Sequence, residues 1–136
     1  KPKMVPARQR KAKILLIEDE EDVREILAAI LTEGGHEVEA VFDGMKGIEL
    51  FKEKDFDLVF SDLGMPVMSG WQVAEKIKAL STKVPVALIT GWNVERNESE
   101  MRDHGVDCII QKPFSVDRVL KLVQECLILK DRFEAA

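Results

Sequence analysis

The sequence is poor in cysteine and has no long apolar run. Its two cysteines, Cys108 and Cys126, are too few and too far apart in the chain for a disulfide framework or a Cys-x-x-Cys site. We therefore predict two reduced thiols, the usual state in the cytoplasm. No apolar stretch approaches the roughly 20 residues of a membrane-spanning helix, and the basic first residues lack the apolar core of a secretory leader. These absences predict a cytoplasmic protein without a membrane segment.

Acidic residues are missing from the first 13 positions, which carry six of the 20 basic residues. Residues 14–136 therefore hold 14 basic against 25 acidic side chains, a net charge of −11. A body this acidic repels the phosphate backbone, so we expect this domain to bind no nucleic acid. Residues 1–12 are expected to form a basic linker or flexible arm; a tail that binds nucleic acid or acidic lipid is the alternative.

Length and composition predict one globular domain. The chain has 136 residues, of which 46% are hydrophobic and 33% are charged, a balance typical of a folded domain. We expect the domain to occupy residues 13–131, followed by a C-terminal tail at residues 132–136. Because the first residue is Lys1, three contexts stay open: a stand-alone protein, an excised piece, or the terminal domain of a longer chain.

Short apolar segments alternate with segments of helical periodicity along the whole chain. Strands are expected at 13–17, 37–41, 58–61, about 85–89 and 108–111. Helices are expected at 23–31, 45–52, 70–80, 93–104 and 116–130, with Ser69 and Ser115 as N-caps. Five successive strand–helix units predict an α/β fold, a doubly wound five-stranded parallel sheet with helices on both faces.

Polar residues follow four of the five expected strands. The pair Glu18-Asp19 follows the first strand, Asp62 the third, Thr90-Gly91 the fourth and Lys112-Pro113 the fifth. In a doubly wound sheet, ligands bind beyond the carboxyl ends of the strands. We therefore expect these residues to converge at one edge of the sheet.

The chemistry of this group is restrictive. Carboxylates gathered in one cleft repel each other, and they stay ionised only when a cation neutralises them. A site of two or three carboxylates suits Mg²⁺. Lys112 and Thr90 add the donors that a phosphoryl group requires during transfer, and Asp62 is then the natural nucleophile. A solvated helix start is the ordinary alternative for residues 18–22, but the placement at four separate strand ends favours a site.

Five motifs in order resemble one known family over about residues 13–130. They are ILLIEDE at 14–20, DLVFSDLGMP at 57–66, MSG at 68–70, PVALITG at 85–91 and KPF at 112–114. Together they resemble the CheY-like receiver domains of two-component response regulators and hybrid histidine kinases. The resemblance implies a flavodoxin-like three-layer sandwich with sheet order 2-1-3-4-5.

The resemblance also implies a role for each site residue. Asp62 is expected to be phosphorylated by a partner's phosphohistidine. The side chains of Asp19 and Asp62 and the backbone carbonyl of Gly64 are expected to hold Mg²⁺, with Glu18 acting through a water molecule. Thr90, Lys112 and the backbone of Gly91 are expected to contact the phosphoryl group, and Pro113 is expected to follow a cis peptide bond. Gly64 and Trp92 are expected to set the lifetime of the phosphorylated state.

By the same resemblance, the chain is a signalling phosphoacceptor that assists its own phosphorylation and dephosphorylation, and not an enzyme in the usual sense. Its expected partner is a sensor histidine kinase or a histidine phosphotransfer domain. The docking face is expected on the first helix together with Phe114, because the apolar residues of that helix spread over a wider arc than one buried stripe needs; they are Val23, Ile26, Leu27, Ile30 and Leu31. A second apolar stripe on the last helix predicts a homodimer or a neighbouring domain; it comprises Val119, Leu122, Cys126 and Leu129. The alternative is a pseudo-receiver that is not phosphorylated and acts as a protein-interaction module.

Overall fold

The computed structural model describes residues 10–91 and 98–136, where five strands alternate with five helices. The strands are β1 (Lys13–Ile17), β2 (Glu37–Val41), β3 (Leu58–Asp62), β4 (Val86–Thr90) and β5 (Cys108–Gln111). The helices are α1 (Glu21–Glu33), α2 (Gly44–Glu53), α3 (Gly70–Leu80), α4 (Glu98–His104) and α5 (Val116–Ala135). The strands form one parallel sheet in the order β2-β1-β3-β4-β5. The predicted doubly wound fold is confirmed.

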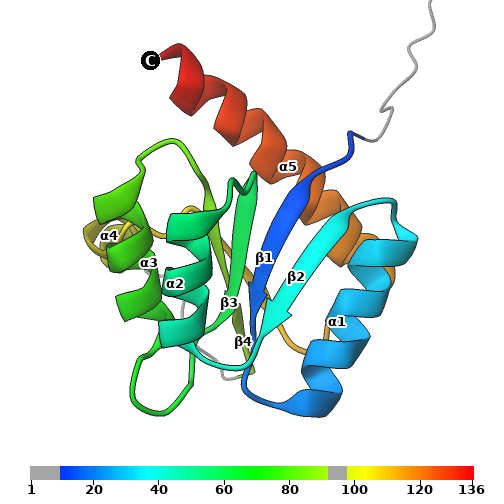
Figure 1. Cartoon of the computed structure of the whole chain (residues 1–136). Helices are drawn as coiled ribbons and strands as arrows, with labels where there is room; N and C mark the ends of the chain where they lie inside the picture. Colours follow the sequence, from blue (N-terminus) through cyan, green and yellow to red (C-terminus); the bar gives the residue numbers. More distant parts are fainter. Residues whose placement is uncertain (1–9, 92–97) are drawn as a thin grey trace, which may run out of the picture.

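Helices cover both faces of the sheet (Figure 1). Alternate residues of β1 serve the two faces, because successive side chains of a strand point in opposite directions. Ile14 and Leu16 lie in a core cluster with residues of α1 and α5, whereas Leu15 and Ile17 lie in a second cluster with residues of α3. The sheet is therefore the middle layer of a three-layer sandwich.

The two central strands β3 and β4 are buried along their whole length. Strands covered on both faces read as continuous apolar runs, which is why the sequence shows no alternation at LVF and VALI. Polar residues enter these strands only near their carboxyl ends, at Ser61, Asp62 and Thr90. Each of those three side chains belongs to a buried residue, so the apolar layers end where the polar edge of the sheet begins.

The predicted N-caps of α3 and α5 are confirmed. The Ser69 hydroxyl accepts a hydrogen bond from the backbone N–H of Gln72, and the Gln72 side chain accepts one from the backbone N–H of Ser69. Ser115 accepts from the backbone N–H of Arg118 at 3.1 Å. These caps satisfy donors that a helix start leaves unpaired, and they fix where both helices leave the functional edge of the sheet.

The helices differ from expectation mainly in the residues at which they begin or end. The first begins at Glu21 and not at Val23, because acidic side chains are favourable in the first turn of a helix. The last continues to Ala135, so residues 132–135, expected in a C-terminal tail, are helical. Its end is held by Lys83, whose Nζ donates to the carbonyl of Phe133 at 2.7 Å. Residues 93–97 of the expected fourth helix lie outside the described part of the chain. None of the described helices is long and apolar enough to cross a membrane.

Residues 10–12, expected within a linker, belong to the folded body. Ala12 is buried, and its backbone N–H donates to Nδ1 of the buried His36 at 3.0 Å. Arg10 forms an ion pair with Asp131 at 2.7 Å. Residues 10 and 12 of the expected linker thus contact the domain, and residues 1–9 lie outside the described part of the chain.

The expected docking surface on α1 needs correction. Leu27 is 1% exposed and packs in the core, so it cannot contact a partner. Val23 and Phe114 are partly buried and pack against the same core cluster. The large apolar residue of α1 that is exposed is Ile26, at 54%. Neighbouring helix residues differ by about 100° in direction, so Leu27 faces the sheet while Ile26 faces solvent.

The expected second contact surface on α5 is also wrong, because most of its residues are buried. Val119, Leu122 and Cys126 are buried in the core cluster shared by α1 and the sheet, and Leu129 is partly buried. The buried face of α5 is wide, because the helix packs against both the sheet and α1. The exposed apolar residues of α5 are Val116 and Ile128, so a dimer or neighbouring domain on this helix would have to use these.

Val67→Asn is expected to stabilise the protein by about 1 kcal/mol. Val67 has a φ of +68° and is 95% exposed, so a β-branched residue occupies the left-handed region without burying its side chain. That conformation costs about 1–2 kcal/mol for ordinary residues and is better tolerated by asparagine. Urea denaturation measures the change, with Val116→Asn as the control at an exposed valine outside the left-handed region. An equal effect in both variants would contradict the argument.

Candidate functional site

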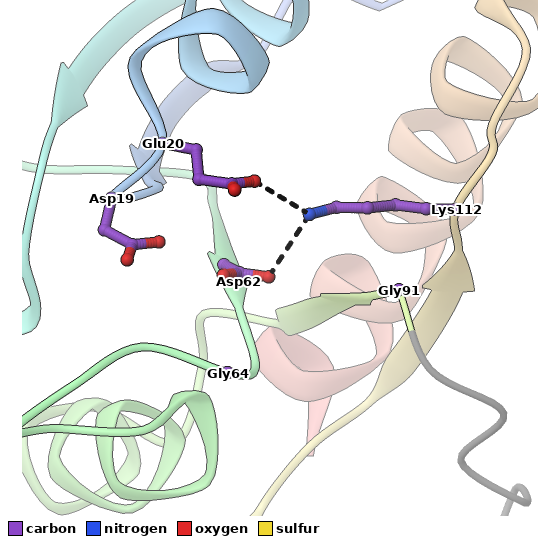
Figure 2. A pocket seen from close by; sticks show the side chains of 6 residues that line it. All are labelled: Asp19, Glu20, Asp62, Gly64, Gly91 and Lys112. Carbon is purple, nitrogen blue, oxygen red and sulfur yellow. Dashed lines mark ion pairs between the residues drawn. The ribbon is translucent and has the colours of Figure 1, made fainter.

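An open pocket of about 340 Å³ lies at the carboxyl edge of the sheet, where the expected site residues meet (Figure 2). The end of β3 contributes Asp62, and the segments after β1, β3, β4 and β5 contribute the rest. The lining residues are Asp19, Glu20, Asp62, Gly64, Gly91 and Lys112. The parallel register places these strand ends side by side, with Asp62 of β3 opposite Ile89 of β4 and Thr90 of β4 opposite Gln111 of β5.

Three carboxylates form a tight cluster at this edge. One oxygen from each of Glu18, Asp19 and Asp62 lies within 4.8 Å of the others. Glu18 is fully buried: its Oε2 accepts from the backbone N–H of Glu20 at 3.1 Å, whereas its buried Oε1 has no hydrogen-bond partner among the residues that the structure describes. Asp62 is 7% exposed and Asp19 is exposed. The cluster thus extends from the buried Glu18 to Asp19, which lies at the solvent-exposed opening of the pocket.

Lys112 lies across the pocket from Asp62 and Glu20, with its ammonium pointing toward both carboxylates (Figure 2). Its Nζ lies 3.7 Å from Oδ1 of Asp62, 3.9 Å from Oε1 of Glu18 and 4.0 Å from Oε1 of Glu20. The backbone N–H of Lys112 donates to the carbonyl of Thr90 at 2.8 Å, and a cis peptide bond joins Lys112 to Pro113. One ammonium is therefore shared among three carboxylates, all beyond hydrogen-bond distance.

Burial raises the pKa values of two carboxyl groups in the cluster, and the charge of Lys112 only partly offsets this rise. The pKa of Glu18 is raised from 4.5 to about 7, chiefly by burial and also by the charge of Asp62, against the lowering effects of the Glu20 N–H and Lys112. Burial also raises the pKa of Asp62, against the lowering effect of Lys112. Both carboxylates would ionise more readily if a further cation lay among them.

The donor set fits a hard divalent cation. The three side chains of the cluster are all carboxylates, and Glu18 Oε1 is a buried acceptor that no described residue hydrogen-bonds. Mg²⁺ prefers such oxygen ligands and keeps several of its waters, which the open mouth at Asp19 leaves room for. The residues present therefore fit Mg²⁺ held by the side chains of Asp19 and Asp62, with Glu18 close behind them.

Mg²⁺ is expected to raise the melting temperature more at pH 8 than at pH 5.5. Because the folded-state pKa of Glu18 lies above its ordinary value, its contribution to stability is fully present below about pH 4.5 and is lost as the pH rises through about 7. The loss is at most about 3 kcal/mol. A bound cation offsets the repulsion that an ionised Glu18 adds to the cluster, and Glu18 is ionised in the folded state at pH 8 but mostly protonated at pH 5.5.

Thermal unfolding with and without Mg²⁺ at both pH values measures this effect. Glu18→Gln is the control, because it removes the titrating group while leaving the opposing contribution of His36, whose pKa is lowered by burial. In this variant, the stability is expected not to decrease between pH 4.5 and 7. A Mg²⁺-induced shift that is larger at pH 5.5 would contradict the account.

The sequence of this domain matches one protein family over most of its length. The family model of the response regulator receiver domain matches residues 14–124. The chain belongs to this family. Receiver domains are the signalling modules of two-component systems that accept phosphoryl groups, so the predicted family, fold and signalling class are confirmed.

Curated relatives of this receiver domain are response regulators from several bacteria. Response regulator protein FleR of Pseudomonas aeruginosa is 37% identical over 113 residues, which cover 82% of this chain and 24% of FleR. Transcriptional regulatory protein DltR of Streptococcus agalactiae is 30% identical over 112 residues, covering 82% of this chain and 50% of DltR. The receiver domain thus spans half or less of these relatives.

Solved structures agree with the sequence relatives. Chemotaxis protein CheY4 of Vibrio cholerae superposes with a TM-score of 0.81 at 28% identity, covering 87% of the receiver domain and all of CheY4. NtrX of Brucella abortus gives a TM-score of 0.85 at 29% identity, covering 93% of the receiver domain and 29% of NtrX. The match to CheY4 runs over its full length, as expected for a CheY-like fold.

The structure brings most, but not all, of the predicted site residues to the pocket surface. Asp19, Asp62, Gly64, Gly91 and Lys112 line the pocket. Glu18 and Thr90 lie behind the surface, at 0% and 1% exposure. Trp92, expected to influence the lifetime of the phosphorylated state, lies outside the described part of the chain.

Two residues of the site were not predicted. Glu20 lines the pocket and pairs with Lys112; it stood in the acidic run but had no assigned role. Arg24 holds the loop before α1, because its Nη1 donates to the carbonyl of Glu18 at 2.9 Å. The spacing of four residues between Glu20 and Arg24 places them one helical turn apart, a signal that could have linked Arg24 to this loop.

Proposed function

We propose that this receiver domain accepts a phosphoryl group on Asp62 from the phosphohistidine of a sensor histidine kinase or a histidine phosphotransfer domain. The observation that carries the proposal is the setting of the Asp62 carboxylate. It ends a central strand, is 7% exposed at the pocket, and has Lys112 Nζ 3.7 Å from its Oδ1 and two further carboxylates in one cluster.

In the proposed reaction, an oxygen of Asp62 forms the new bond to phosphorus while the bond from phosphorus to the donor's imidazole nitrogen breaks. The bonding electrons leave with the imidazole, which remains on the partner. Lys112 faces the negative charge on the transferring group, and the Thr90 hydroxyl and the Gly91 N–H are the proposed neutral donors. The same residues would assist the later hydrolysis by water, so the domain promotes its own phosphorylation and dephosphorylation.

Mg²⁺ is the proposed cofactor. Asp19, Asp62 and the carbonyl of Gly64 would hold it, with Glu18 acting through a water molecule. When bound, it supplies positive charge against the phosphoryl oxygens. Its presence also favours the ionised form of Asp62, whose pKa is raised by burial; only the carboxylate is a nucleophile.

Phosphorylation is proposed to switch the face formed by α4, β5 and α5. Thr90 ends β4 and Lys112 follows β5, and the two are joined by the hydrogen bond from Lys112 N–H to Thr90 carbonyl at 2.8 Å. A phosphoryl group on Asp62 that attracts both side chains would act on the segments leading to α4 and α5. The transition would thus begin at the β4–β5 pair.

The proposed kinase contact is a revised apolar surface beside the site. Ile26 is its exposed residue at 54%, and the partly buried Val23 and Phe114 are the other members. These residues come from α1 and from the turn after Lys112-Pro113, both of which begin at the functional edge of the sheet. A partner helix seated there would bring its phosphohistidine close to Asp62.

Incubation with acetyl phosphate and Mg²⁺, followed by intact-mass spectrometry, tests the proposed function. The expected result is one added phosphoryl group per chain, and no addition when a chelator removes Mg²⁺ before acetyl phosphate is added. A protein that stays unmodified under conditions that phosphorylate a known receiver domain would support the pseudo-receiver alternative and contradict the proposal.

A further inference from the structure

The two cysteines, 18 residues apart in the chain, are in contact in the fold. Cys108 begins β5 and Cys126 lies in the middle of α5. The Cys126 thiol donates a hydrogen bond to Cys108 Sγ, with 3.6 Å between the sulfur atoms. The expectation of two separate reduced thiols did not foresee this contact, and the proposed phosphorylation chemistry does not use either residue.

The two thiols differ in access and in protonation. Cys126 is fully buried, whereas Cys108 is partly exposed. The hydrogen bond to Cys108 and burial both raise the pKa of the Cys126 thiol, so Cys126 keeps its proton and remains the donor. A soluble oxidant therefore reaches Cys108 first. The Cys126 thiol is already in contact with Cys108 and can react with the oxidised sulfur.

We propose that Cys108 and Cys126 are a redox-modification site, at which a peroxide converts the two thiols into a reversible intramolecular disulfide. The site is independent of the proposed phosphorylation of Asp62. Cys108 is the residue attacked by the oxidant, and Cys126 is the resolving thiol.

The reaction balances with one peroxide molecule. The Cys108 thiolate attacks a peroxide oxygen, so an S–O bond forms and the O–O bond breaks; the hydroxide that leaves takes up a proton and becomes water. Cys126 Sγ then attacks the Cys108 sulfenic acid, forming the S–S bond and breaking the S–O bond. The second hydroxide takes the Cys126 proton. Two thiols are oxidised while hydrogen peroxide is reduced to two waters, and an excess of a small dithiol reverses the change.

Closure requires the sulfur atoms to approach from 3.6 Å to about 2.05 Å. Cys108 packs against the core cluster that contains Cys126 and its neighbour Leu122, so the backbones are already held together. The disulfide would join α5 covalently to β5, the strand that leads into Lys112. Intracellular disulfides of this kind are usually transient and redox-sensing.

Peroxide titration of the whole chain tests the proposal. After treatment, the protein is denatured, its remaining thiols are tagged with a maleimide, and its intact mass is measured. Both thiols are expected to be lost together from a monomer that has lost two hydrogen atoms, with full recovery after dithiothreitol. Disulfide-linked dimers, or no loss of thiols at a dose that oxidises free cysteine, would overturn the proposal.

Single-cysteine variants test the assigned order. In Cys126→Ala, oxidation is expected to stop at a Cys108 sulfenic acid, which dimedone traps; Cys126→Ser serves if the alanine variant does not fold. In Cys108→Ala, the buried Cys126 is expected to keep its thiol at the same peroxide dose. Dimedone labelling of Cys126 in that variant, at the rate seen for Cys108, would overturn the order of attack.

Discussion

Asp62→Asn is expected to lower phosphorylation by acetyl phosphate at least about 100-fold, because an amide cannot replace the carboxylate nucleophile. Asparagine has nearly the same shape as aspartate, so the variant is expected to fold. Its stability should not fall below that of the wild type, because burial raises the pKa of Asp62 and the ionised side chain is unfavourable there without a cation. Phosphate-affinity gels measure the incorporated fraction over time.

Asp55→Asn is the matched control for this prediction. Asp55 is exposed and precedes β3, so it lies at the opposite end of the strand that carries Asp62. The control variant is expected to incorporate phosphate at the wild-type rate. Substantial incorporation in Asp62→Asn would show that another residue is the acceptor.

Gly70→Ala is expected to destabilise the protein by about 3 kcal/mol, at the upper end of the usual cost of overpacking. A Cβ at this position would lie 2.6 Å from the carbonyl oxygen of Asp62 and 2.8 Å from the Cα of Leu63. Both are backbone atoms, so no side-chain rotation relieves the clash. The first turn of α3 already contacts this segment, because the Gly70 N–H donates to the Leu63 carbonyl at 2.9 Å. The cost should therefore appear in the strand end that positions Asp62.

Gly91→Ala is the control at a second glycine beside the pocket. Its Cβ would lie 3.5 Å from the Cδ of Lys112, an ordinary contact with a flexible side chain, so little loss of stability is expected. Urea denaturation compares the two variants, and acetyl phosphate incorporation shows whether Gly70→Ala also slows phosphorylation. Equal stability of the two variants would contradict the proposed close approach of α3 to β3.

The doubly wound parallel sheet and the place of the site could be predicted because they depend on local patterns, whereas the order of the strands was implied by the resemblance to receiver domains. Apolar runs ending in Asp62 and Thr90 mark the carboxyl ends of strands, and parallel strands bring those ends to one edge. Lys112 could be placed there for the same reason. None of these inferences requires knowledge of how wide a face of each helix is buried by its neighbours.

The errors concern helix faces and contacts between distant residues. Periodicity groups Val23 with Leu27, and Leu122 with Cys126, but it does not show how wide a face the sheet and a neighbouring helix will cover. Leu27 and Leu122 are core residues because α1 and α5 pack against each other as well as against the sheet. The meeting of Cys108 and Cys126 depends on the same packing of α5, which the sequence pattern does not specify.

The most direct test of the central claim is to locate the phosphoryl group in the wild-type chain. The protein is phosphorylated with acetyl phosphate and Mg²⁺, the acyl phosphate is reduced with borohydride to a stable alcohol, and the peptides are sequenced by mass spectrometry. The account predicts a single modified residue, Asp62, which is unmodified when Mg²⁺ is omitted. Modification at Asp19, Glu18 or Glu20, or at Asp62 to the same extent without a divalent cation, would contradict it.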